Sequence, residues 1–267
     1  SSLYFHTTDT TKYKNGEATI TSTNGNNETD SYINLNANDN SYRYSGPSSN
    51  VNNYVCFGTD NESTCLNDTS NNGVSKYLYR IIGVFDDGNG NYQAKIILAN
   101  YWYNTKLSSA TFYWDYTGNS YSNAWATSAL KERLNGEPLK TGASNYYPDN
   151  SVVSNYTDPW LSIIAPSTWY VKGNFTMGKA IQFYTTEIYN VKNNISGYTT
   201  NYQGNSSTVN NVKVGLIYGS DYLYAASPNK WNYTGSSAGN YSSQNWLYTN
   251  TRWTITPYSE NGENVVR

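Results

Sequence analysis

The stretch KYLYRIIGVFDDGNGNYQAKIILANYW, residues 76–102, carries the strongest structural signal in this chain of 267 residues. Two runs rich in aromatic and β-branched residues, 77–85 and 92–101, flank the turn sequence DDGNGN. Such runs on both sides of a Gly- and Asn-rich turn are typical of a β-hairpin. Because neighbouring apolar residues such as Ile81 and Ile82 interrupt the alternation, we expect strands that are buried on both faces.

Two later blocks have the same character. VKVGLIYGSDYLYAAS spans residues 212–227, and WLYTNTRWTITPYSENGENVVR spans residues 246–267. Each contains short aromatic or β-branched runs that stop at residues favouring turns, which predicts a small antiparallel sheet with long loops. NYVCFG, residues 53–58, predicts a further short strand.

One helix is well defined by the sequence SNAWATSALKERLNG, residues 122–136. Ser122 or Asn123 can serve as its N-cap, and Gly136 can end it. One apolar stripe is formed by Trp125, Ala126, Ala129, Leu130 and Leu134. A second, weaker helix is expected over residues 178–189.

Composition excludes several classes of protein. Charged residues make up 13% of the chain and the formal net charge is −2. We find no cluster of Lys and Arg, which argues against binding to nucleic acid. The sequence contains no run of 18 apolar residues, so it predicts no membrane span. The first residues, SSLYFHTTDTT, resemble a mature N-terminus. No cofactor motif is recognised.

The two cysteines, Cys56 and Cys65, lie nine positions apart and enclose a polar, turn-like sequence. A metal site is not indicated, since no second cysteine pair and a single histidine accompany them. We interpret them as a local disulfide, with two free thiols as the alternative. A disulfide in turn favours an oxidising compartment.

Residues 1–45 are polar and repetitive, with two β-like pieces at 18–23 and 31–35. They are interpreted as an N-terminal arm or assembly segment, and residues 46–267 as the main domain. The predicted fold class is α+β, with mixed antiparallel sheets, one or two helices and long loops.

From Asn53 onward a series of motifs occurs in a set order, at residues 53–58, 78–85, 125–136, 169–170, 182–185, 215–227, 245–248 and 253–259. This order resembles that of bacterial surface or secreted proteins with a C-type-lectin-like domain, which are related in fold to formylglycine-generating enzymes. Many members of this group are attached to pilin-like or repeat regions, so the resemblance implies a role at the cell surface or in an appendage. The related enzymes use a reactive cysteine pair in the C-terminal half. Cys56 and Cys65 lie early, so that activity is not carried over.

The end of the sequence departs from that family, which continues past WTITPYS with another hairpin and a core strand. This difference predicts that the closing strand is missing, rearranged or supplied by a neighbouring molecule. An open sheet edge is a template for pairing between chains. We therefore expect a homo-oligomer or polymer that assembles by strand complementation.

The residues that could carry chemistry are few. His6 is the single histidine and is expected to lie at the surface or to pack beside a strand. The turn after Asp86 resembles a calcium loop but fits a hairpin turn better, because Leu98 stands where an EF-hand needs Glu. Glu137-Pro138-Leu139 is the nearest match to a sugar- and calcium-binding motif, and a helix-ending turn is favoured. Carboxylates available for glycoside hydrolysis are Asp115, Glu132, Asp158, Glu187 and Asp221.

None of these carboxylates stands in a diagnostic motif. Asp221 is expected on or beside a strand, in a structural role. Nine sequons mark candidate glycosylation sites at Asn27, Asn61, Asn67, Asn155, Asn174, Asn194, Asn205, Asn232 and Asn240. Chance alone accounts for about this number in a chain so rich in Asn, Ser and Thr, so the sequons do not indicate selection for glycans.

Together these features predict an extracellular structural or adhesive protein of the cell surface, a subunit of a pilus-like filament, without enzymatic activity. The alternative is a lectin-like module that binds a glycan or a host-surface protein through its loops. A hydrolase is the weakest hypothesis.

Overall fold

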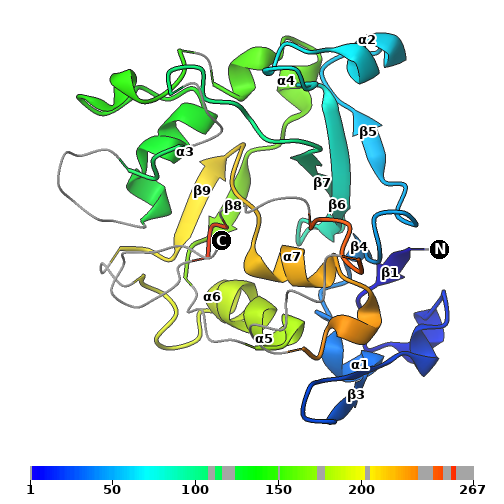
Figure 1. Cartoon of the computed structure of the whole chain (residues 1–267). Coiled ribbons are helices and arrows are strands. Elements are labelled where there is room, and N and C mark those ends of the chain that lie inside the picture. The colour runs from blue at the N-terminus through cyan, green and yellow to red at the C-terminus, as the bar shows by residue number, and fades with distance from the viewer. Residues whose placement is uncertain are drawn as a thin grey trace.

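The computed structural model describes residues 2–107, 112–115, 124–149, 151–172, 178–201, 205–233, 243–248 and 254–256. It has a mixed α+β architecture in which the strand pairs are antiparallel, as predicted (Figure 1). The strands are β1 (Leu3–Phe5), β2 (Thr21–Thr23), β3 (Thr29–Ser31), β4 (Tyr42–Tyr44), β5 (Tyr54–Cys56), β6 (Leu78–Asp86), β7 (Tyr92–Leu98), β8 (Ser167–Tyr170) and β9 (Thr208–Val212).

The helices are short. They are α1 (Tyr32–Leu35), α2 (Glu62–Asn67), α3 (Ala129–Leu134), α4 (Trp160–Ile163), α5 (Ala180–Tyr184), α6 (Asn190–Lys192) and α7 (Gly219–Tyr224). Single 3₁₀ turns lie at Thr10–Lys12, Glu17–Thr19, Trp125–Thr127, Ala143–Asn145, Val153–Asn155 and Pro228–Lys230. Among the described residues, no helix combines the length and apolar character needed to cross a membrane.

The predicted hairpin is confirmed as β6 and β7. Asp87 N–H donates to the carbonyl of Asn91, and the carboxylate of Asp86 accepts from Gly88 N–H, so the DDGNGN sequence forms the turn. The register shifts between Ile81 and Gly83, a bulge that inserts one residue into β6. Burial on both faces holds only for the middle of β6, because residues 92–94 of β7 are exposed.

The main sheet has the order β1-β4-β6-β5, with β7 on the other side of β6. The sequence-based prediction placed residues 1–45 outside the core, whereas β1 and β4 are strands of this sheet. Tyr42 pairs with Val84, and Phe5 pairs with Tyr42. The N-terminal segment therefore packs as part of the same sheet and is not a separate arm.

The piece at residues 31–35 was expected to be a strand, but α1 occupies residues 32–35. Tyr32 and Leu35 are three positions apart, so a helical turn buries both on one side. They pack in one cluster with Tyr184, Tyr224 and Trp231. The buried cluster, more than the β propensity of the segment, determines its conformation.

A second difference concerns GLIYGSDYLYAAS, residues 215–227, which was expected to contribute strands. Residues 219–224 form α7, and β9 ends just before this block at Val212. The carboxylate of Asp221 accepts a hydrogen bond from the N–H of Tyr218 at 3.0 Å, which caps the helix start. Of the closing block, a single parallel bridge joins Thr254 to Ile217 within the described residues. Residues 257–267, to which the prediction of a missing closing strand refers, lie outside them.

Both predicted helices are present. α3 follows a 3₁₀ turn that begins at Trp125, and Ser128 is its N-cap, with its hydroxyl accepting from Lys131 N–H. Ser122 and Asn123, the expected caps, lie outside the described residues. The second helix runs from α5 through a π-helical segment, Thr185–Tyr189, into α6.

Each of three core clusters is built around a fully buried tryptophan: Trp125, Trp231 and Trp246. Large aromatic side chains thus supply the buried area in a chain that is poor in aliphatic residues. The predicted disulfide between Cys56 and Cys65 is confirmed, with a Cα–Cα distance of 5.8 Å. It connects β5 to α2.

Candidate functional site

A groove of about 1540 Å³ runs along β7. One wall is formed by the β6–β7 hairpin, and the other by residues 163–170 and 213–218. In Figure 1 these segments face each other between the main sheet and the β8–β9 pair. Concave features of this kind are where ligands and partner segments bind.

The groove follows the open edge of β7. All seven residues of this strand line it. Because successive side chains of a strand point to opposite faces, a groove that touches every one of them passes the β7 edge. The groove also extends over β6, where Ile81, Ile82 and Phe85 line it. Within the described part of the chain, β6 is the only strand that pairs with β7. Within those residues, the outward-facing backbone groups of β7 have no strand partner, and an edge of this kind is where another strand can add.

Much of the groove wall is apolar. Ile96, Leu98, Ile163 and Trp169 contribute to it, and the side chain of Ile163 is 62% exposed.

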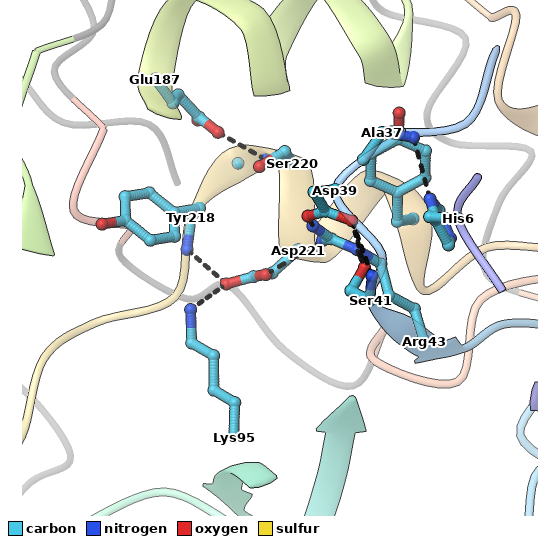
Figure 2. A network of polar contacts seen from close by, with 12 residues as sticks. His6, Ala37, Asp39, Ser41, Arg43, Lys95, Glu187, Tyr218, Ser220 and Asp221 are labelled. Atoms are coloured by element: carbon cyan, nitrogen blue, oxygen red, sulfur yellow. Dashed lines mark hydrogen bonds and ion pairs between the residues drawn. The ribbon is translucent and has the colours of Figure 1, made fainter. Parts of the chain in front are cut away.

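A network of ionised groups opens onto the groove (Figure 2). Lys95 on β7 lies 2.5 Å from Asp221 on α7, measured from Nζ to Oδ2. Arg43 on β4 lies 2.7 Å from Asp39 and 3.5 Å from Asp221. The guanidinium of Arg43 is buried and also donates to Ser41 Oγ at 2.9 Å. Two cations and two carboxylates thus join the main sheet to α7.

Asp221 has the structural role that the sequence favoured, although it lies on a helix. Its carboxylate caps α7 and receives both cations, and its side chain is 1% exposed. Buried ion pairs of this kind are costly to break, because the remaining partner would be an uncompensated buried charge.

Glu187 lies in the π-helical segment and reaches the same end of α7. Its carboxylate accepts from Ser220 N–H at 3.0 Å and from the hydroxyl of Thr256. Burial, with a smaller contribution from the charge of Asp221, raises the pKa of Glu187 to about 7, although the hydrogen bonds from Ser220 and Thr256 oppose the shift. Glu187 therefore keeps its proton to a higher pH than an ordinary carboxyl group does. A catalytic pair of carboxylates in a cleft is not needed to explain the raised pKa of Glu187, since its carboxylate is wholly buried.

His6 follows β1 directly and packs beside this strand, which was one of the two positions predicted for it. Its Nδ1 accepts a hydrogen bond from Ala37 N–H at 2.9 Å, and its ring contacts Tyr224 and Trp231. Burial and the nearby charge of Arg43 lower the pKa of His6 to about 3, against the opposing effect of Asp39. The imidazole is neutral and structural at physiological pH.

The other candidate carboxylates are spread over the surface and the α3 region. Asp115 pairs with Lys140 at 3.0 Å, and Glu132 accepts from the backbone N–H of Lys140. Asp158 is exposed and precedes Pro159. Of the five carboxylates, the structure brings together Glu187 and Asp221, at the start of α7.

The Glu137-Pro138 sequence forms a turn, as predicted. Glu137 N–H donates to the carbonyl of Glu132 at 2.8 Å and its carboxylate pairs with Lys131, so Glu137-Pro138 belongs to the turn that ends α3. In the described parts of the chain, no group of three His, Cys, Asp or Glu side chains is arranged to hold a metal ion.

The sequons differ in accessibility. The prediction of a glycosylation site at Asn232 is wrong. Asn232 is buried, and its amide donates to the carbonyls of Ser22 and Glu28, so a glycan there would disrupt the fold. Asn155 is half-buried. The exposed sequons, which remain predictions, are Asn27, Asn61, Asn67, Asn194 and Asn205. Asn174 and Asn240 lie outside the described residues.

Comparisons with known proteins add no assignment. No family model matches the chain, and neither a curated protein nor a solved structure resembles it significantly.

Sequence reasoning missed Lys95 and Arg43, the cations of the network. Their signal was weak but present. Arg43 stands between two tyrosines in YRY, and Lys95 interrupts the apolar run of β7. A lone charge inside a strand of this kind indicates a buried partner elsewhere in the chain.

Proposed function

We propose that this protein is an extracellular subunit with a C-type-lectin-like fold, and that it assembles into a cell-surface filament or adhesive layer. In this proposal the groove along β7 accepts an extended strand from a second copy. The observation that carries the proposal is a strand edge, unpaired on one side within the described residues, beside a groove that contains apolar side chains such as Ile96 and Leu98. No catalytic role is assigned to the chain.

The chemistry of the groove favours a weakly charged occupant. Its walls carry lysines such as Lys192 and Lys213 and acids such as Asp86, so no single sign of charge dominates. Apolar side chains lie between them. A strand that is itself apolar and poor in charge fits such walls, and this chain has that composition, with a net charge of −2. Copies with so little charge also repel each other weakly.

Strand addition would satisfy the open backbone groups of β7 and bury the exposed apolar wall in one step. Seven residues of β7 offer a pairing length of about 23 Å at about 3.3 Å per residue. Main-chain hydrogen bonds would supply the affinity, and the apolar positions of the groove would supply the register.

The test substitutes one groove residue and a matched control. Ile163→Glu places a charge on the groove wall, while Leu66→Glu changes a side chain of similar exposure, 55%, on α2 away from the groove. We expect wild type and Leu66→Glu to form assemblies in negative-stain images as concentration rises, and Ile163→Glu to remain as isolated particles. Hydrogen exchange should slow at β7 on assembly of the wild type.

Isolated particles of the wild type at high concentration, with unchanged exchange at β7, would overturn the proposal. Equal assembly of the two variants would show that another surface makes the contact.

A glycan-binding module is the second candidate, favoured by one observation. Tyr101, Trp102 and Tyr103 line one end of the groove, where aromatic faces could stack on sugar rings. A glycan array probed with the wild type, with and without calcium, tests it. The absence of any hit would remove this candidate and leave the assembly proposal unaffected.

A further inference from the structure

An amine and a carboxyl group meet where β7 approaches α7. Lys95 Nζ lies 2.5 Å from Asp221 Oδ2, and the two residues are 126 positions apart in the sequence (Figure 2). The side chains are 21% and 1% exposed. Such proximity gives a high effective concentration of each group for the other.

Aromatic rings surround the amine. Lys95 Nζ lies 4.5 Å from the ring centroid of Tyr218 and 5.2 Å from that of Trp169. These rings lie beside the contact between the amine and the carboxylate. Removing the two charges of an ion pair from water costs free energy. That cost would disappear if the amine and the carboxylate became one neutral group.

A third ionisable group lies at the same helix end. Asp221 accepts from Tyr218 N–H, and Glu187 accepts from Ser220 N–H, so the two carboxylates cap successive residues of α7. Burial raises the pKa of Glu187 to about 7.

We propose that Lys95 and Asp221 condense to an isopeptide bond that joins β7 covalently to α7. Nζ forms a bond to Cγ of Asp221, and one Cγ–O bond breaks. The departing oxygen takes two of the three ammonium protons and leaves as water, so that the neutral amide retains one hydrogen on Nζ. No oxidant, reductant or external group is required.

The charges that remain support this step. Condensation removes one cation and one anion, and Arg43 keeps its closer partner Asp39, at 2.7 Å against 3.5 Å for Asp221. The amide oxygen that is retained can still accept from Tyr218 N–H and cap α7. The link closes a long loop of chain, which stabilises the folded state as a disulfide does, by restricting the unfolded chain.

Mass spectrometry of the full-length wild type, reduced at its disulfide, tests the proposal directly. We expect a mass lower than that of the linear chain by one water molecule. Trypsin should release a branched peptide in which residues 81–106, uncut at Lys95, are joined to residues 214–230. An intact mass equal to that of the linear chain, with both peptides released separately, would overturn the proposal.

Variants locate the bond. Lys95→Arg keeps the charge but cannot form the amide, so it should have the mass of its linear chain. Lys213→Arg changes another groove lysine, whose Nζ donates to the carbonyl of Leu161, and should keep the loss of water. Asp221→Asn should form the same bond with loss of ammonia in place of water. Loss of water in Lys95→Arg would place the modification elsewhere and overturn the assignment.

This inference does not rest on the proposed assembly, since the mass of an isolated subunit decides it.

Discussion

Glu187 Oε2 accepts a hydrogen bond of 3.0 Å from Ser220 N–H, so that a buried carboxylate caps the first turn of α7. The same carboxylate receives the hydroxyl of Thr256, which holds the closing segment 254–256 against the helix. The protonation state of one buried group therefore affects two segments that are distant in the sequence.

Glu187→Gln should flatten the dependence of stability on pH. The pKa of Glu187 is raised from 4.5 to about 7 in the folded protein. The folded state thus binds more protons than the unfolded state between these values, and stability that is present below pH 4.5 is lost as pH rises through 7. The loss is about 3 kcal/mol at most, at about 1.4 kcal/mol per pKa unit. Urea unfolding at a series of pH values measures it.

Glu62→Gln is the matched control for this prediction. Glu62 is exposed in the first turn of α2, so its removal should leave the slope between pH 5 and 7 unchanged. The idea fails if Glu187→Gln follows the wild-type curve over this range.

His6→Asn should make the protein more tolerant of acid. The pKa of His6 is lowered from 6.5 to about 3, because the imidazole is buried and lies near Arg43. The unfolded state therefore binds the extra proton first, and stability that is present above pH 6.5 is lost as pH falls toward 3. The asparagine carbonyl can replace Nδ1 as the acceptor for Ala37 N–H. We expect a smaller drop in Tm between pH 6.5 and 4 than in the wild type. A drop of equal size would show that His6 does not cause the acid sensitivity.

The hairpin at residues 78–98, the helix ending at Leu134 and the Cys56–Cys65 disulfide were predictable, because each rests on local sequence. The conformation of residues 219–224 was not. Its aromatic residues fit a strand, and the cap that makes it a helix depends on Asp221, which in turn is held by Arg43 and Lys95 from distant strands.

The candidate site shows the same limit. Glu187 and Asp221 were both recognised as available carboxylates, but nothing local predicts that two helices bring them to one helix end. The glycosylation sequon at Asn232 is a local sequence motif. The burial of Asn232, in contrast, depends on the distant β2–β3 hairpin that packs over it. Non-local packing decides what a local motif can do.

Gly83→Ala should destabilise the main sheet. A Cβ at Gly83 would lie 2.4 Å from the carbonyl oxygen of Tyr42 and 3.3 Å from Cα of Arg43, so β4 would have to move away from β6. Overpacking of this kind costs about 1–3 kcal/mol. Chemical denaturation of the purified variant measures the change. Gly25→Ala is the control, because a Cβ there meets nothing within 4 Å. Equal stability of the two variants would contradict the tight contact between β4 and β6.

Removal of the disulfide should have a moderate effect. Cys56 and Cys65 close a loop with a sequence separation of 9, so the bond restricts a short stretch of the unfolded chain. Loop-closure entropy predicts a loss of about 2–3 kcal/mol for a loop of this size. The double variant Cys56→Ala, Cys65→Ala should therefore unfold at a lower denaturant concentration than the oxidised wild type. Reduction of the wild type should produce a loss of similar size and no further loss in the variant. If the reduced wild type unfolds at the same concentration as the oxidised form, the bond adds nothing to the attachment of α2 to β5.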